Sequence, residues 1–292
     1  MALTLKSLSP FGAEAQGVNL WEQLSDAQVK IMQDAWSQSG LLIFRRQALA
    51  EGELVRFSAV FGATESIVRA DWASAAFPQV IQISNMKDSS GRSIGGLGAG
   101  ELDWHTDQSY VVAPATGSVL YMVEMPANAP ATYWANLQLA YAALDADTRA
   151  RCEGVDVVYD YLARQSTYDD EPQMSAELRR NTPIVTHPLV NTHPVTGARS
   201  LYLDPTTAVG ILGWDEALGR AFLDELRAHV TQPQFVYTHQ WQIGDVVMWD
   251  NGVLMHRRDA FDATGNRLLK RTTLKLSAAQ HIVPSGTELL EA

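Results

Sequence analysis

The chain has 292 residues, 46% of them hydrophobic and 19% charged, a composition that excludes disordered and collagen-like proteins. The formal net charge of -11 disfavours nucleic acids and anionic membranes as partners, because both require a basic surface. The sequence has no apolar run of about 18 residues, and its one cysteine cannot form an internal disulfide, so we expect a cytoplasmic protein without a membrane span.

The N-terminal part predicts two helices with a short strand between them. Apolar side chains recur near helical spacing from Ser25 to Ser37, with Ser25 as the N-cap. The apolar run GLLIFR at residues 40–45 then predicts a strand. A second helix is expected from Glu51 to Phe61, because Gly62 follows it.

A strand pattern from Val80 to Ser84 precedes the segment MKDSSGRSIGGLGAGEL at residues 86–102. This segment is too rich in glycine and serine to hold a regular helix or strand. Glycine-rich loops of this kind can become ordered over a bound substrate, so we predict a flexible lid at residues 86–102. A plain surface connection is the alternative.

Short strand patterns dominate the rest of the chain, with helical patterns at 137–151 and 215–229. The strand patterns are SVLYMVEM, IVTHPLV, SLYLDP, FVYTHQWQ, DVVMWDN, GVLMHRR and LKRTTLKL. Many short strands with few helices predict a mainly β fold with α insertions, a sandwich or a barrel, in preference to an alternating βα sheet. No repeat or linker divides the sequence, so we expect a single domain over residues 1–292.

The stretch LDWHTDQSY places His105 and Asp107 two residues apart, directly after the glycine-rich segment. Residues i and i+2 of an extended strand point to the same face, so both side chains can reach one metal ion. Two imidazoles and one carboxylate on one side of an ion are the ligands of non-haem ferrous oxygenases. The pair therefore predicts two of the three ligands of an iron site.

His256 is the expected third ligand. The sequence DVVMWDNGVLMHRR predicts a strand, a turn at 250–252 and a second strand, with His256 at the end of this hairpin. His187 and His193 each precede a proline and are expected in loops or at strand edges. The other three histidines have no acidic or histidine partner at ligand spacing; they are His229, His239 and His281.

Two arginines follow in the stretch NRLLKRTTLKL. Arg267 and Arg271 are an even number of residues apart, so on one strand they face the same way. A guanidinium binds a carboxylate through two parallel hydrogen bonds, which a lysine cannot reproduce. Downstream of the His-x-Asp pair, these arginines indicate a site for a small acid; solvated strand charges are the alternative.

Taken together, the sequence resembles the taurine and 2,4-dichlorophenoxyacetate dioxygenase (TauD/TfdA) family of Fe(II)- and 2-oxoglutarate-dependent enzymes. The resemblance covers most of the chain, in the order FGAEAQGVNL, GLLIFRRQAL, FSAVFGA, WHTDQSY, THPLVNTHPVTGARSLYL, GDVVMWDNGVLMH and RLLKRTTL. It implies a double-stranded β-helix, a cupin-like jelly roll with the iron at its open end. It also implies O2 and 2-oxoglutarate as cosubstrates and a homo-oligomer, a dimer or a tetramer.

The resemblance also assigns roles to individual residues. His105, Asp107 and His256 would bind the iron. Arg267 would bind the distal carboxylate of 2-oxoglutarate, and Thr132, in APATYWANLQLAY, stands where the family has a threonine that contacts this cosubstrate. The implied reaction is oxidation of an unactivated C–H bond of a small anionic organic molecule, with release of succinate and CO2.

Other positions bear on the substrate. Arg271 matches a position near the anionic group of the substrate or the cosubstrate. The sequence departs from the family at 129–131, where Ala-Pro-Ala replaces Gly-Gly-Asp, and at Gly252, where relatives carry an arginine. Taurine-type enzymes have substrate-contacting His and Tyr where this chain has VRADWASA, with Arg69, Asp71 and Trp72. We therefore do not expect taurine as the substrate, and Arg69 and Arg92 indicate another anion.

A different class of protein is the alternative. A non-catalytic module of the same fold could bind a metal and a small acid without turning the acid over. The simultaneous presence of three metal ligands and two arginines favours the enzyme.

Overall fold

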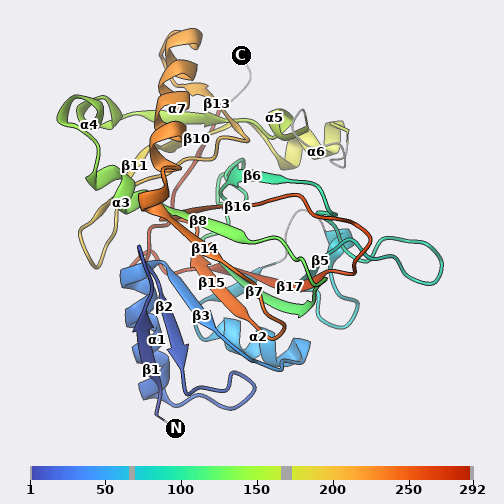
Figure 1. The fold of residues 1–292 in the computed structure, drawn as a ribbon. Helices are drawn as coiled ribbons and strands as arrows, with labels where there is room; N and C mark the ends of the chain where they lie inside the picture. The colour runs from blue at the N-terminus through green and yellow to red at the C-terminus, as the bar shows by residue number, and fades with distance from the viewer. Residues whose placement is uncertain (1, 66–69, 166–172, 290–292) are drawn as a thin grey trace.

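The computed structural model describes residues 2–65, 70–165 and 173–289. These residues form a mainly β protein with helices against both ends of its sheets, as Figure 1 shows. The predicted class, mainly β with α insertions, is confirmed at this level. Within the described ranges, no helix is both long and apolar enough to cross a membrane.

The largest layer is an 8-stranded sheet with the order β1-β2-β3-β15-β7-β17-β4, in which β5 pairs with β17. Its neighbours are antiparallel except for the parallel pair β2 and β3. Its strands are β1 (Thr4–Ser7), β2 (Ala13–Gln16), β3 (Leu41–Phe44), β4 (Ala63–Glu65), β5 (Val80–Ser84), β7 (Gly117–Glu124), β15 (Val246–Asp250) and β17 (Leu268–Lys275).

A 4-stranded sheet with the order β14-β8-β16-β6 packs on one face of the large sheet. Its strands are β6 (Leu102–His105), β8 (Thr132–Asn136), β14 (Val236–His239) and β16 (Leu254–Arg258). Val247 and Trp249 of β15 enter the same buried hydrophobic cluster as Trp134 and Leu254 of the smaller sheet. The apolar core between the two sheets therefore joins the strands that carry the candidate site.

Helices cover the other face of the large sheet. Met32 and Trp36 of α1 (Asp26–Ser39) share a hydrophobic cluster with Leu54 of α2 (Glu51–Ala59) and with Val246 and Met248 of β15. Successive side chains of a strand point to opposite faces, so β15 supplies apolar side chains to both layers. This explains why its sequence is a continuous apolar run rather than an alternating one.

The remaining elements lie beyond the smaller sheet, with α4 and α7 at the upper end in Figure 1. Leu137 of α3 and Phe222 of α7 bury their side chains in one cluster with Met255 of β16. The strands of this region are β9 (Asp156–Tyr159), β10 (Val185–Pro188), β11 (Val190–Thr192), β12 (Arg199–Leu201), β13 (Ala208–Ile211) and β18 (Thr287–Glu288). The helices are α3 (Leu137–Ala142), α4 (Ala146–Cys152), α5 (Tyr161–Gln165), α6 (Ala176–Asn181) and α7 (Glu216–Val230).

The first two predicted helices are present as α1 and α2, and side-chain and glycine capping defines the ends of α1. Ser25 accepts a hydrogen bond from the backbone N–H of Gln28, and Gly40 ends α1 in the left-handed conformation at φ 69°. The single helix predicted from Leu137 to Arg151 is wrong, because two helices occupy it. Asp145 accepts hydrogen bonds from the backbone N–H groups of Asp147 and Thr148, so its side chain starts a new helix.

The hairpin predicted around residues 250–252 is also wrong. Strand β15 pairs with β3 and β7, whereas β16 pairs with β6 and β8 in the other sheet. The turn at Gly252, whose N–H donates to the carboxylate of Asp250, therefore carries the chain from one sheet to the other. Both strands are buried, and burial in a two-layer core decided the pairing against the local hairpin pattern.

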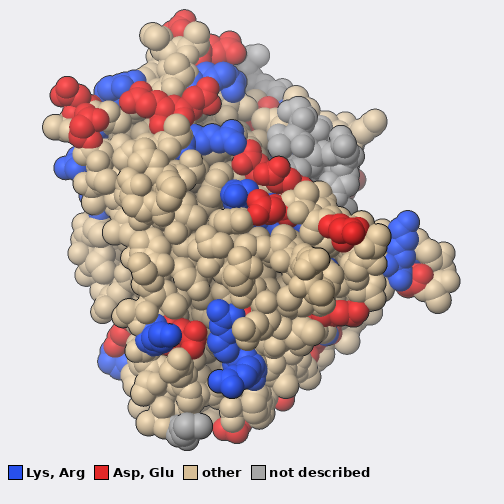
Figure 2. All heavy atoms as spheres, viewed as in Figure 1, with Lys and Arg blue, Asp and Glu red and all other residues tan. Residues whose placement is uncertain are grey.

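The charged side chains on the face in Figure 2 do not form one continuous basic area among the described residues. Lysines and arginines are interspersed with acidic side chains, and a broad uncharged surface separates the charged groups at the two ends.

Candidate metal centre

The pairing of β6 with β16 brings two predicted ligands together. His105 and His256 are register partners in this antiparallel pair, and the centroids of their rings lie 4.1 Å apart. Both side chains are buried between the strands, with 6% and 8% of their surface exposed. Two residues that lie far apart in the sequence therefore face the same point.

Asp107 reaches this point from a turn and not from a strand. Strand β6 ends at His105, and the chain turns through Gln108, whose φ is 56°. The expectation that His105 and Asp107 share one strand face is therefore wrong, although their side chains do converge. One ligand atom from each of His105, Asp107 and His256 lies within 4.8 Å of the other two.

The hydrogen bonds leave suitable nitrogen atoms facing the centre. Nδ1 of His105 lies 2.7 Å from the backbone carbonyl of Asp103, so this nitrogen carries the proton and Nε2 keeps its lone pair. Nε2 of His256 lies 3.9 Å from Oδ1 of Asp107. The arrangement offers two imidazole nitrogens and one carboxylate oxygen, which are donors that suit a ferrous ion.

The carboxylate of Asp107 is held by three neighbours. Nη1 of Arg271 donates to Oδ1 at 2.9 Å, while the hydroxyl of Ser118 donates to Oδ2 at 2.8 Å. The side-chain amide of Asn251 donates to Oδ2 over a longer 3.4 Å. Asn251 is itself fixed, because its oxygen accepts the indole N–H of Trp249 at 2.8 Å.

The electrostatics favour the protonation states that a metal requires. Burial opposes ionisation of Asp107, but the Arg271 guanidinium and the two histidines hold the pKa of this carboxyl well below its usual range. Burial lowers the pKa of His105, and burial with the neighbouring His105 lowers the pKa of His256 further. Deprotonated imidazoles next to a carboxylate are the forms that bind a divalent cation.

A cavity beside the three residues contains the predicted cosubstrate contacts. It is lined by His105 and His256 and also by Thr132, Arg267 and Arg271. Arg267 is 2% exposed, and burial with the like charge of Arg258 lowers its pKa to about 9. Arg258, Arg267 and Arg271 all line this buried space, which is costly, and a dicarboxylate is the kind of ligand that would offset this cost.

The hydroxyl of Thr132 is oriented by a residue that sequence patterns did not single out. Nε1 of Trp241 donates to Oγ1 of Thr132 at 2.8 Å, and both side chains are 5% exposed. Because the hydroxyl accepts from the indole, its own proton is available to donate to a ligand.

Other residues near the site also lay outside the sequence-based predictions. The guanidinium of Arg258 donates to the carbonyls of Leu97 and Gly100, at 2.9 and 2.7 Å, and so ties the glycine-rich segment to β16. The positive charge of Arg164 contributes to the lowered pKa of both His105 and His256. The family pattern of ligands gave no signal for either arginine, since both contacts depend on tertiary structure.

The two loop arginines that indicated an anionic substrate are Arg69 and Arg92. Arg69 lies outside the described residues. Arg92 is 85% exposed and pairs with Asp88 four residues before it, so it does not line the cavity. The glycine-rich segment contains isolated bridges, such as that between Lys87 and Ser93, and no regular element before β6.

A mainly β fold with a buried two-histidine, one-carboxylate centre beside an arginine-lined cavity defines the class of non-haem iron oxygenases. The sequence profile of the taurine catabolism dioxygenase TauD, TfdA family matches residues 4–273. The chain belongs to this family, so the predicted enzyme class is confirmed: an Fe(II)- and 2-oxoglutarate-dependent dioxygenase that also uses O2.

Relatives of known activity and solved structures agree with this membership. The chain is 30% identical to the alpha-ketoglutarate-dependent 2,4-dichlorophenoxyacetate dioxygenase of Cupriavidus pinatubonensis, over 94% of this chain and 98% of the relative. It is 33% identical to the (S)-phenoxypropionate/alpha-ketoglutarate-dioxygenase of Delftia acidovorans, over 86% and 87% of the two chains. The structure of AAD-2 in complex with Mn(II) and N-oxalylglycine superimposes with a TM-score of 0.81 at 28% identity, covering 95% and 98% of the two chains.

Proposed function

We propose that the protein oxidises an unactivated C–H bond of a small anionic organic substrate, coupled to conversion of 2-oxoglutarate and O2 into succinate and CO2. The observation that carries the proposal is the convergence of His105, Asp107 and His256 within 4.8 Å, on a cavity that also contains Arg267. In this proposal the ferrous ion, when bound, supplies the activation of O2 that protein side chains cannot supply.

The protein's own residues would position the reactants and keep the Asp107 carboxylate ionised. His105, Asp107 and His256 hold the metal on one face and leave its other face open. Arg267 grips the distal carboxylate of 2-oxoglutarate through its planar guanidinium, and the hydroxyl of Thr132 donates a further hydrogen bond.

Arg271 has a role on the metal side of the site, since it already pairs with Asp107. It keeps the carboxylate ionised and directed at the metal. It also lines the cavity, so we propose that its remaining N–H groups meet an anionic group of the substrate or cosubstrate. Relatives named for phenoxyacetate, phenoxypropionate and sulfate ester substrates support an organic anion.

The wider architecture follows the same proposal. We propose that the two facing sheets form the double-stranded β-helix expected from the resemblance, within one domain of residues 1–292, and that the protein is a cytoplasmic homo-oligomer. Residues 86–102 would act as the lid, because Leu97 lines the cavity while its carbonyl is held by Arg258. A lid held in this way excludes water from the reacting groups.

The direct test is oxygen-dependent succinate formation from 2-oxoglutarate with Fe(II), measured with a panel of small organic acids. We expect at least one acid to stimulate succinate formation and to gain an oxygen atom or lose hydrogen. A second readout is the visible charge-transfer band of the anaerobic Fe(II) and 2-oxoglutarate complex, which should change when a substrate binds. Silence in both assays with every acid would favour the non-catalytic binding module.

A further inference from the structure

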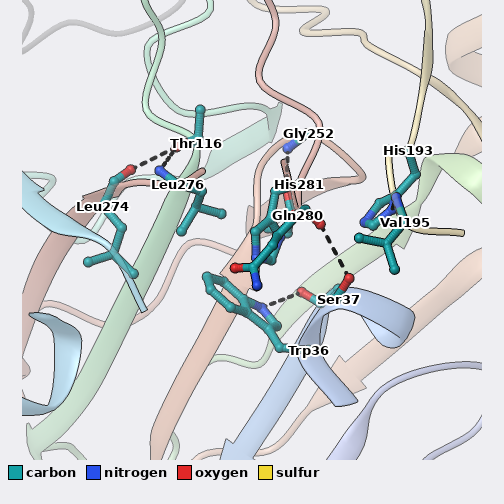
Figure 3. A network of polar contacts seen from close by, with 12 residues as sticks. Trp36, Ser37, Thr116, His193, Val195, Gly252, Leu274, Leu276, Gln280 and His281 are labelled. Carbon is teal, nitrogen blue, oxygen red and sulfur yellow. Dashed lines mark hydrogen bonds and ion pairs between the residues drawn. The ribbon is translucent and has the colours of Figure 1, made fainter. Parts of the chain in front are cut away.

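A second cluster of two histidines and one aspartate lies away from the proposed iron site. His193 follows β11, Asp250 ends β15, and His281 lies in the segment after β17. One ligand atom of each lies within 4.8 Å of the other two. Figure 3 shows His193 and His281 approaching each other from separate segments, above Trp36 of α1.

All three side chains are buried, and one of them is a carboxylate. His193 and Asp250 are each 1% exposed and His281 is 5% exposed. The carboxylate of Asp250 accepts hydrogen bonds from Nδ1 of His281 at 2.7 Å and from the N–H of Gly252 at 2.8 Å. Among the residues that the structure describes, no lysine or arginine pairs with Asp250, whose ion-pair partner is His281. A buried carboxylate without such a partner favours a cation beside it.

His193 directs an unsatisfied nitrogen into the cluster. Its Nε2 is buried and makes no hydrogen bond to the described chain, while Nδ1 accepts two long contacts of 3.3 Å from the N–H groups of Val195 and Thr196. Buried polar atoms in native proteins almost always have a partner, so this nitrogen requires one: an acceptor while Nε2 carries the ring proton, or a cation once the proton is on Nδ1. Burial lowers the pKa of His193, and the nearby carboxylate of Asp250 offsets only part of this effect, so the imidazole is kept in the neutral form that can bind a metal ion.

The segment that carries His281 is held firmly against the cluster. The ring of His281 packs on Trp36 with 4.9 Å between centroids, and the hydroxyl of Ser37 donates to the carbonyl of Gln280. A Cβ at Gly252 would lie 2.5 Å from the carbonyl oxygen of Ile282, so the close approach requires glycine at this turn. Packing against neighbouring residues therefore holds His281 and the turn after Asp250 in place, in addition to the contacts within the cluster.

We infer that His193, Asp250 and His281 form a second divalent-cation site, separate from the proposed iron site. Two imidazoles and one carboxylate suit a borderline-soft ion such as Zn2+. Such an ion would join the turn after β11, the end of β15 and the C-terminal segment, so its role would be structural. Coordination by Nε2 of His193 requires the ring proton to move to Nδ1, with release of the two long backbone contacts.

The test is zinc stoichiometry on the full-length, metal-free protein, measured by titration calorimetry and by metal analysis after dialysis. The wild-type protein should bind two zinc ions. Asp107→Asn, which disables the first cluster, should retain one. His281→Gln should also retain one, because glutamine keeps a hydrogen-bond donor for Asp250 but removes the imidazole. The double variant should bind none.

Matched controls make the outcome decisive. His229→Gln alters a histidine outside both clusters and should leave two zinc ions bound, and circular dichroism checks the fold of every variant. If His281→Gln does not fold, His193→Gln replaces it. One zinc ion on the wild-type protein with none on Asp107→Asn would overturn the inference, and so would two on His281→Gln. If the wild-type protein binds one zinc ion and Asp107→Asn binds none, the positive charge beside Asp250 is a protonated imidazole and not a metal ion.

Discussion

Among the described residues, two buried clusters each consist of two histidines and one aspartate, and they differ in what surrounds them. In the first, the carboxylate of Asp107 has an arginine partner, and the cavity beside it contains Arg267 and Thr132. In the second, Asp250 accepts from Nδ1 of His281 and from the N–H of Gly252, and no lysine or arginine pairs with it among the described residues. The ring of His281 packs against Trp36. We propose that two histidines and an aspartate bind a cation in each cluster, whereas catalysis also needs charged groups placed for a cosubstrate.

Breaking one cluster at a time gives the largest expected contrast. His105→Ala removes a metal ligand and should lower substrate-dependent succinate formation by more than about 100-fold. Mutation of a residue that only hydrogen-bonds to a metal ligand typically costs about 10- to 100-fold. His281→Gln should leave turnover per folded molecule close to that of the wild type, because the second cluster lies outside the cavity. Equal losses of succinate formation in both variants would contradict the assignment of a catalytic role to the first cluster and a structural role to the second.

Removing Arg271 tests the charge difference between the two aspartates. Arg271→Gln leaves the buried carboxylate of Asp107 without its cation, which should destabilise the metal-free protein by about 3 kcal/mol in denaturant unfolding. The pKa of Asp107 should rise, since Arg271 is the largest influence that lowers it. Fe(II) binding requires the ionised carboxylate, so on acidification the variant should lose iron at a higher pH than the wild type. An unchanged pH profile would mean that Arg271 does not control this ligand.

Arg267 distinguishes a cosubstrate site from a simple cation site. Arg267→Ala should raise the KM for 2-oxoglutarate by about 10- to 100-fold, because a charge-assisted pair contributes about 1.5–3 kcal/mol. Arg267→Lys is the matched control, which keeps the charge but loses the planar fork and should recover only part of the affinity. A KM that stays at the wild-type value in both variants would place the cosubstrate elsewhere.

The smallest effect is expected at Trp241, which positions Thr132. Trp241→Phe removes one hydrogen bond of about 1 kcal/mol, so the KM for 2-oxoglutarate should rise about fivefold with little change in kcat. A purely structural role would lower stability and leave KM alone. Thermal unfolding of the same variant, measured with and without 2-oxoglutarate, separates the two results.

The sequence predicted elements whose signals are local. Ser25 caps α1 because its hydroxyl accepts from a residue three positions on, an interaction that needs no tertiary contact. The break at Asp145 was also a local capping signal, but the continuous helical pattern around it concealed the break. The predicted hairpin of β15 and β16 was wrong because two apolar strands adjacent in the sequence can join different sheets of a layered core. Only long-range packing decides which sheet each strand joins.

The same limit applies to the sites. The motif around His105 and Asp107 identified the first cluster through its spacing, even though Asp107 lies in a turn. The second cluster has no such spacing, because His281 contacts an aspartate 31 residues away and His193 lies in the turn after β11. Cation sites assembled from three distant segments become visible only once the fold has placed them together.

The central claim is that His105, Asp107 and His256 hold Fe(II) while Arg267 holds 2-oxoglutarate beside it. The most direct measurement is the anaerobic visible spectrum of the protein titrated with Fe(II) and then with 2-oxoglutarate. We predict a new charge-transfer band in the wild type that is lost in His256→Ala and needs more 2-oxoglutarate in Arg267→Ala. A wild-type protein that develops no band, or a band that persists in His256→Ala, would contradict the account.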